Sequence, residues 1–223
     1  MLSQAERIAQ NVKPYAFANE DDIFEFQSLR DDLKGKLSFS DEGMKIQGGS
    51  GLNSHFDQSL LARRVDEENI EVSVKVFFEP ECDRHLAGLV FIYDTAHWHY
   101  LYITKKANKK ICKALSCDQG SLIYYDNEVE FDDEWIKLSA VVKNKNITFF
   151  VNDKLVEENI DASILSDEHI HLGFTGAMVG VNCIDIEKKE KSAVFKNFQY
   201  RSMEDENYVL AMHNKFGKME SEG

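Results

Sequence analysis

Carboxylates are the commonest side chains in this chain that could do chemistry, with 39 Asp and Glu residues among 223. Hydrolysis of a glycosidic bond needs two of them about 5–10 Å apart across the scissile bond. The runs Asp21-Asp22 and Asp132-Asp133-Glu134 are typical of exposed turns. Asp167 and Glu168 are better candidates for a role, although capping or hydrogen bonding at a turn suits them better than acid–base work. The sequence therefore selects no catalytic pair.

Histidines form two H-x-H pairs, His97/His99 and His169/His171. In a strand this spacing puts both imidazoles on one face, where they could bind zinc together with a third ligand. No third ligand is marked by spacing, so we expect solvent-facing histidines and no metal.

Nucleophile and cofactor motifs are missing from the sequence: it has no G-x-S-x-G elbow, no P-loop and no dinucleotide fingerprint. We therefore expect no catalytic residues and no cofactor. The cysteines form no C-x-x-C pair, which predicts free thiols and a reducing, cytoplasmic location; they are Cys82, Cys112, Cys117 and Cys183.

Aromatic residues are the remaining side chains with binding chemistry, because their faces stack on sugar rings and Tyr and Trp add a polar group. The candidates are Tyr93, Trp98, Tyr100, Tyr102, Tyr124 and Tyr125. Most aromatic residues of a β-sandwich fill its core. Trp98, flanked by histidines, is the one expected nearest the surface.

Adjacent arginines Arg63 and Arg64 must point to opposite faces of a strand. One of them is then directed inward, where it needs a carboxylate or carbonyl partner. We favour a structural tie over a ligand contact.

Composition excludes several partners. The net charge of −13 and pI of about 5.0 argue against nucleic acid and anionic membrane surfaces, which require a basic footprint. We expect no secretory signal in the first residues and no membrane span. A hydrophobic content of 43% supplies a sizeable core.

Strand signals fill the middle of the chain. Ile70, Val72, Val74 and Val76 alternate, and polar turns at 143–146 and 152–153 predict a hairpin meander. In the last strand the period of two puts Phe195 on one face and Phe198 and Tyr200 on the other. These patterns predict an antiparallel sandwich over residues 21–201. Helical extensions are expected in 1–20 and 202–223, with helices over 3–11 and 203–216.

The stretch Leu165–Gly180 combines the turn Leu165-Ser166-Asp167-Glu168 with three glycines within eight residues, Gly173, Gly176 and Gly180. Glycine at this density permits close backbone approach or positive φ. The stretch is therefore either a tight crossing inside the β-structure or the rim of a site.

Motifs along the chain stand in a recognisable order: Asp22-x-Phe24, Gly51-Leu52-Asn53-Ser54, Gln58-Ser59-Leu60-Leu61-Ala62-Arg63-Arg64, Phe78-Glu79-Pro80, Ala87-Gly88-Leu89, Tyr93, the Leu165–Glu168 turn, Phe174-Thr175-Gly176-Ala177, Val179-Gly180, Asp185, and Phe195-x-x-Phe198-x-Tyr200. In this order they resemble the C-terminal concanavalin A-like domain of β-xylosidases of glycoside hydrolase family 43.

The resemblance implies an all-β, two-sheet antiparallel jelly-roll sandwich. In such two-domain enzymes the catalytic carboxylates lie on a separate propeller, and the loop matching 174–180 contributes an aromatic side chain to the sugar pocket. Here Met178 stands where the family has phenylalanine. Methionine offers no ring face. Sandwiches of this class can hold a structural calcium ion, but the sequence shows no ligand loop for one.

The sequence and the resemblance together predict a non-catalytic accessory domain. It would bind a xylo- or arabino-oligosaccharide, or a glycosidase catalytic domain, through its concave face. The residues expected near that face are Arg63, Trp98, Phe174, Thr175 and Met178. Two alternatives stay open: a small glycoside hydrolase with its own carboxylate pair, and an interaction protein that forms homo-oligomers.

Overall fold

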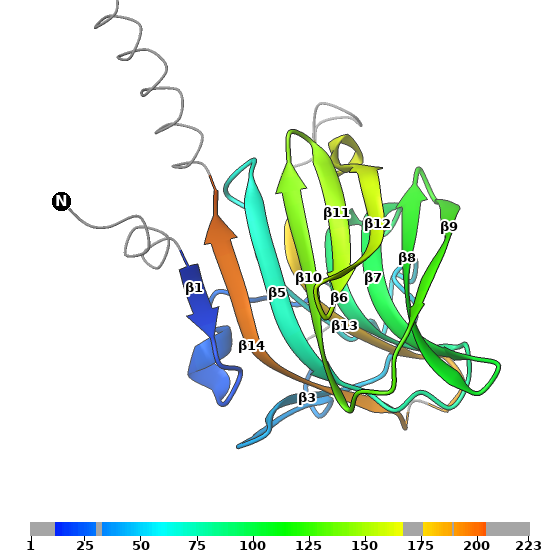
Figure 1. The fold of residues 1–223 in the computed structure, drawn as a ribbon. Helices are drawn as coiled ribbons and strands as arrows, with labels where there is room; N and C mark the ends of the chain where they lie inside the picture. The colour runs from blue at the N-terminus through cyan, green and yellow to red at the C-terminus, as the bar shows by residue number, and fades with distance from the viewer. Residues whose placement is uncertain (1–11, 30–32, 167–175, 189, 204–223) are drawn as a thin grey trace, which may run out of the picture.

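The computed structural model describes residues 12–29, 33–166, 176–188 and 190–203. These residues form two antiparallel sheets packed face to face (Figure 1), which confirms the predicted sandwich. No helix within them is long and apolar enough to cross a membrane.

The strands divide into sheets of eight and six within the described part of the chain. The larger sheet has the order β12-β11-β10-β5-β14-β3-β2, with β1 paired to β14, and the smaller has the order β4-β13-β6-β7-β8-β9. The strands are β1 (Val12–Tyr15), β2 (Leu37–Ser40), β3 (Gly43–Gln47), β4 (Leu60–Arg64), β5 (Ile70–Phe77), β6 (His85–Asp94), β7 (His97–Lys106), β8 (Lys109–Asp118), β9 (Ser121–Glu130), β10 (Trp135–Lys143), β11 (Asn146–Val151), β12 (Lys154–Asp161), β13 (Met178–Asp185) and β14 (Ser192–Ser202). Two short 3₁₀ helices are η1 (Glu20–Ile23) and η2 (Ala162–Leu165).

The predicted meander is confirmed at β10–β11–β12. The β10–β11 hairpin turns on Asn144 and Lys145 with φ of 52° and 60°, and the next turn uses Asn152 and Asp153 at 46° and 62°. Two consecutive positive φ values are what a tight hairpin needs to match the right-handed strand twist. Polar residues in these turns therefore set the pairing next to each turn, whereas the β11–β12 register shifts farther along, between Ile147 and Phe150.

A β-bulge in β14 makes the period-two expectation for this strand wrong. The pairing with β5 shifts between Lys196 and Gln199, and Asn197 takes the left-handed φ of 53°. The extra residue reverses the alternation. Phe195, Phe198 and Tyr200 consequently all point into the core between the sheets.

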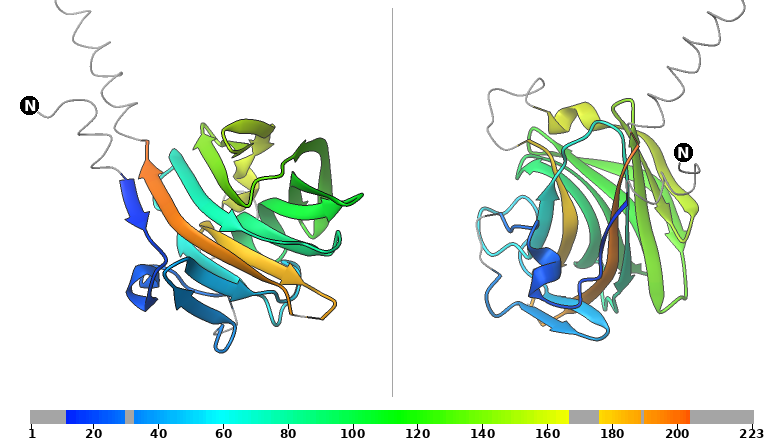
Figure 2. Two further views of the ribbon diagram at one scale, coloured as in Figure 1. Left: turned by 60° about the horizontal axis from the view of Figure 1, so that its bottom comes forward. Right: turned by 90° about the vertical axis from the view of Figure 1, so that its left-hand side faces the viewer.

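The N-terminal segment also differs from the expectation. Val12–Tyr15, placed in a helical extension from the sequence, forms β1 and pairs with β14 from Val12↔Arg201 to Tyr15↔Phe198 (Figure 2). The predicted helix over 3–11 lies outside the described residues, as does the predicted helix over 203–216 apart from Met203, which is in neither a helix nor a strand.

Apolar side chains form two buried layers. One fills the space between the sheets and includes Phe91, Phe149, Phe195 and Phe198. The other covers the opposite, outer face of the six-stranded sheet and includes Leu60, Val90, Ile92 and Tyr100. The six-stranded sheet is thus apolar on both faces.

Close approach of β13 and β4 depends on Gly180, which pairs with Ala62. A Cβ at Gly180 would lie 2.1 Å from the Leu61 carbonyl oxygen and 2.4 Å from the Ala62 Cα.

Because backbone atoms cannot rotate away, Gly180→Ala is expected to lower the free energy of unfolding by about 3 kcal/mol. Gly51→Ala is the matched control, since a Cβ there meets nothing within 4 Å. Urea denaturation of both variants measures the difference, and equal stabilities would contradict the predicted clash.

Candidate functional site

The outer face of the six-stranded sheet, called the outer face from here on, is the candidate binding surface. Cross-strand pairs align its side chains in rows. One row runs Arg64, Met178, Ile92, Trp98, Cys117 and Leu122; the next runs Ala62, Gly180, Val90, Tyr100, Leu115 and Tyr124; a third runs Leu60, Asn182, Gly88, Tyr102, Lys113 and Glu128. Residues from all six strands therefore meet on one surface.

Half of the outer face is covered by the chain itself. Gln27 exchanges two backbone hydrogen bonds with Ala62 on β4, and its side-chain amide lies 3.9 Å from the Met178 sulfur. The segment 48–58 covers Trp98, whose indole N–H donates to the Asn53 side-chain oxygen at 2.9 Å. Met178 is 2% exposed and Trp98 3% exposed.

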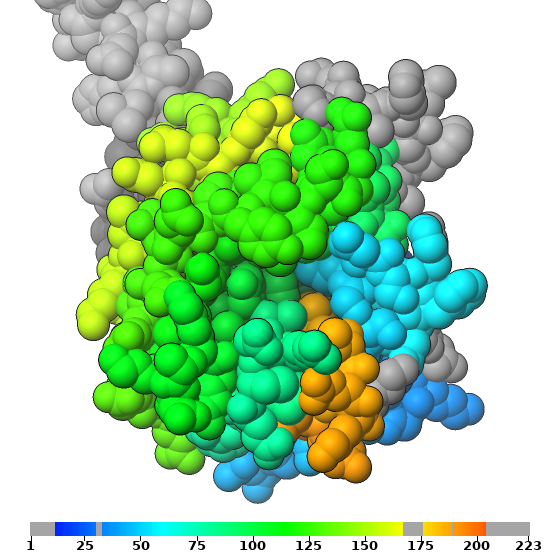
Figure 3. Space-filling model, turned by 90° about the vertical axis from the view of Figure 1, so that its right-hand side faces the viewer, coloured from blue at the N-terminus to red at the C-terminus, as the bar shows by residue number. Residues whose placement is uncertain are grey.

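The other half of the outer face is open toward β9. Tyr102 is half-buried and stacks on Tyr100 with ring centroids 5.3 Å apart. Leu122 and Tyr124 on the edge strand are 41% and 72% exposed. Figure 3 views this side of the molecule, which is hollowed where the green β8–β9 region meets the cyan 50–60 segment and the orange β13 region. An aromatic and aliphatic surface of this kind suits the apolar faces of a sugar ring.

Charged groups border the open half. Glu128 lies 2.7 Å from the Lys106 ammonium and 3.7 Å from that of Lys113. The hydrogen bond from Lys106 is the main cause of a lowered pKa at Glu128. A glycosidase general acid needs the opposite shift, so this carboxylate suits orientation of a ligand rather than proton donation. Burial raises the pKa of Tyr102 to about 12, which keeps its hydroxyl a donor.

The loop after β13, called the rim from here on, is held in place by one carboxylate, that of Asp185. Asp185 is 1% exposed, and its two oxygens accept four backbone N–H groups, from Glu187, Lys188, Glu190 and Lys191, at 3.0–3.1 Å. Burial alone would raise the pKa of Asp185, but the four donors outweigh it and lower the pKa.

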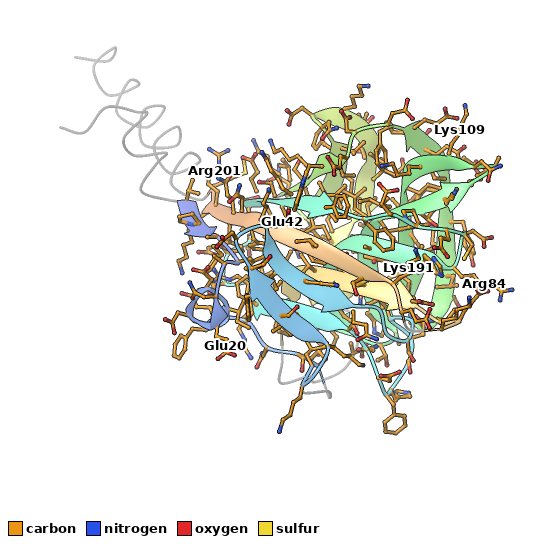
Figure 4. All side chains as sticks on the ribbon, turned by 90° about the horizontal axis from the view of Figure 1, so that it is seen from below. Glu20, Glu42, Arg84, Lys109, Lys191 and Arg201 are labelled. Atoms are coloured by element: carbon orange, nitrogen blue, oxygen red, sulfur yellow. The ribbon has the colours of Figure 1, made fainter. Side chains whose placement is uncertain are left out.

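The β5–β6 loop is attached to this rim. Lys191 pairs with Glu81, Arg84 pairs with Glu187 at 3.1 Å, and Arg84 and Lys191 lie at the same end of the sandwich in Figure 4. Cys82, His85 and Glu187 place ligand-type atoms within 4.8 Å of one another. However, His85 accepts from the Glu81 N–H through Nδ1 and faces Asp185 through Nε2 at 3.6 Å. Both ring nitrogens are thus engaged by the protein, which fits a structural attachment better than a metal site.

The side chain of Arg63, on β4, lies on the inner face of the six-stranded sheet, whereas Met178 and Trp98 lie on its outer face. It is 3% exposed, whereas Arg64 is exposed, as the alternation predicts. Its guanidinium reaches Glu25 at 3.1 Å and Asp66 at 3.4 Å, and its Cζ lies 4.2 Å from the centre of the Tyr200 ring. Arg63 therefore ties the two sheets together at one end of the core.

The remaining predicted site residues fall into two groups. Trp98 and Met178 share the outer face but are buried beneath the chain's own segments, so the expectation of a surface Trp98 was wrong. Phe174 and Thr175 lie outside the described residues, as do Asp167 and Glu168.

The expected solvent-facing positions of His97 and His99 were also wrong, because both are buried. His97 contacts Asp94 at 2.8 Å and His99 contacts Ser116 at 2.7 Å. Burial lowers the pKa of His99 to about 4, which keeps it neutral at pH 7.

Tyr102 and Tyr124 were among the candidate stacking residues but were not predicted as site residues. Their alternation along β7 and β9 gives the face they occupy. It does not show that β9 is an edge strand, and this edge position is what leaves Tyr124 exposed.

Comparison with known proteins gives a match to one family model, described as the beta xylosidase C-terminal concanavalin A-like domain, over residues 15–201. The β-xylosidase of Bacillus subtilis is 30% identical over 193 residues, which cover 79% of this chain and 36% of that enzyme. Xylosidase/arabinosidase 43B of Humicola insolens is 28% identical, with coverage of 81% and 37%. The chain thus spans little more than a third of the length of these relatives.

Solved structures with the same fold include xylan β-1,4-xylosidase of Bacillus halodurans, with a TM-score of 0.72 and 26% identity over 80% of this chain and 37% of that one. The carbohydrate binding module CBM66 of Bacillus subtilis matches with a TM-score of 0.54 and 13% identity over 81% of this chain and 97% of the module. At that identity the second likeness concerns the fold alone.

Arg63→Met tests whether this arginine is a tie or a ligand contact. Loss of the cation–π contact and the partly exposed ion pairs is expected to lower the free energy of unfolding by about 2 kcal/mol. Ligand affinity of the folded variant should be unchanged. Urea denaturation measures the free energy of unfolding, and calorimetric titration with xylo- and arabino-oligosaccharides measures affinity. A variant of unchanged stability with weakened binding would show that Arg63 contacts the ligand.

Asp185→Asn tests the rim. The folded-state pKa of Asp185 lies below the unfolded value of about 3.9, so the ionised carboxylate stabilises the fold above roughly pH 4 and this contribution is lost as pH falls. The variant is expected to be less stable at pH 7, and its deficit should shrink below pH 4. Denaturant melts between pH 7 and pH 3 measure this, with the exposed Asp126→Asn as control. A deficit independent of pH would contradict the assignment.

Proposed function

The chain belongs to the family of β-xylosidase C-terminal concanavalin A-like domains, and from this premise we propose that it is an accessory domain that binds saccharide through the open half of its outer face. The match concerns the C-terminal domain of these enzymes only. Such a role needs no catalytic group of the domain's own.

The observation that carries the proposal is the exposed Tyr124, 72% accessible, next to Leu122 and one row from Tyr102. A sugar ring laid against these side chains would remove apolar area from water on both partners. Lys113 and Glu128 lie in the row of Tyr102 and can exchange hydrogen bonds with ring hydroxyls. The arrangement is an apolar platform with polar groups at its border, as in many small-ligand sites.

The names of the relatives indicate which saccharides to try. They are called β-xylosidase and xylosidase/arabinosidase, and the CBM66 neighbour is called a carbohydrate binding module. Xylo- and arabino-oligosaccharides are therefore the first ligand class.

A glycosidase catalytic domain is the alternative occupant of the same face. Met178 occupies the position from which the family presents an aromatic side chain, and here it lies under Gln27. Direct contact of Met178 with a partner would require the segment around Gln27 to move, so the structure favours saccharide over this partner.

Tyr124→Ala is expected to weaken oligosaccharide binding about tenfold, because loss of one stacking aromatic face costs on the order of 1.4 kcal/mol. Phe24→Ala is the matched control, since Phe24 is also an exposed aromatic residue, at 92%, but lies away from the outer face, directly after η1. Isothermal titration with xylo- and arabino-oligosaccharides measures both. No heat across the panel would exclude saccharide binding, and a complex with a glycosidase chain in light scattering would then support the alternative.

A further inference from the structure

The solvent-facing side of the eight-stranded sheet carries a cavity of about 510 Å³ beside β1. Its lining includes Tyr15, Asp22, Ser73, Lys75 and Lys137; Asn197 and Gln199 complete its polar wall. A volume of this size suits a one- or two-ring ligand.

Three lysines cross the sheet in one row beside this cavity. The register pairs Lys196 with Lys75 and Lys75 with Lys137, on strands β14, β5 and β10. Neighbouring strands are about 4.8 Å apart, and like charges directly opposite one another are destabilising. A row of three ammonium groups is therefore costly unless each finds a partner.

Two of the three lysines have partners in the structure. Lys137 lies 3.0 Å from Asp153, and the Lys196 ammonium lies 3.6 Å from the centre of the Trp135 ring. Among the described residues, no carboxylate forms an ion pair with Lys75, which is exposed in the cavity wall. Asp22 also faces the cavity, but its carboxylate accepts the Ala18 and Asn19 N–H groups at 2.7 and 3.3 Å.

The β14 bulge also lines the cavity, next to Ser73 and Lys75 on β5. Asn197, at φ 53°, donates its backbone N–H to the Ala16 carbonyl at 3.2 Å, and the shift of register places both Asn197 and Gln199 at the cavity. Ser73 donates to the Gln199 side-chain oxygen at 3.5 Å. Bulges that re-aim side chains are over-represented beside functional sites.

We propose that this cavity binds a sugar that carries a carboxylate, with Lys75 pairing the carboxylate and Asn197, Gln199 and Ser73 bonding the hydroxyl groups. Amide and hydroxyl groups together offer the donors and acceptors that sugar hydroxyls need. An ammonium without a carboxylate partner supplies the charge contact. The choice of a sugar rests on the carbohydrate-related role proposed above, whereas the site is independent of the outer face of the six-stranded sheet.

Glucuronate and xylose are matched probes, because glucuronate is the xylose ring with a carboxylate on C5. In ¹⁵N NMR titrations of the full chain at low salt, we expect glucuronate to shift the amides of Ser73, Lys75 and Gln199. We expect it to bind about tenfold more tightly than xylose, the gain from one charge-assisted contact. Inorganic phosphate should bind more weakly than glucuronate, because it cannot use the amide wall.

Lys75→Met should weaken glucuronate binding about tenfold and leave xylose unchanged. Lys45→Met is the control, since Lys45 is exposed on β3 and does not line the cavity. Tyr124→Ala should leave the glucuronate shifts intact, which separates this site from the proposed one. Equal affinity for glucuronate and xylose, phosphate binding as tight as glucuronate, or loss of binding in Lys45→Met or Tyr124→Ala would each overturn the proposal.

Discussion

Burial of both faces of the six-stranded sheet is the constraint on which the rest of the structure depends. Its inner face packs on the eight-stranded sheet, but its outer face is also apolar, with Ile92 and Trp98 in one row and Val90 in the next. Apolar area exposed to water costs about 25 cal/mol per Å², so this second face needs a cover. Segments 25–29 and 48–58 supply that cover over Met178 and Trp98, and the uncovered remainder is the surface for which saccharide binding is proposed.

The family relation accounts for the fold but leaves open how the surface is used. The relatives are about three times as long as the part that matches, and Met178 of this chain lies beneath Gln27 instead of projecting from the surface. The open half of the outer face offers aromatic stacking at Tyr102 and Tyr124, and the cavity beside β1 offers charge.

The bulge in β14 shows how one backbone irregularity acts on both sides of a sheet. On the inner side it brings Phe195, Phe198 and Tyr200 together in the core, where Tyr200 meets the Arg63 guanidinium. On the outer side it places Asn197 and Gln199 beside Lys75. Core packing and the surface cavity are thus coupled through a single extra residue.

Three features were determined by the sequence alone: the sandwich, the meander and the opposite directions of Arg63 and Arg64. They follow from the alternation of apolar residues along each strand and from the polar residues in the turns. These features are local, because period two and turn chemistry depend on neighbouring residues. The burial of Trp98, His97 and His99, the pairing of β1, and the exposure of Tyr124 were decided only by the tertiary structure. They depend on which distant segment covers a strand and which strand ends a sheet, and no local pattern carries that information.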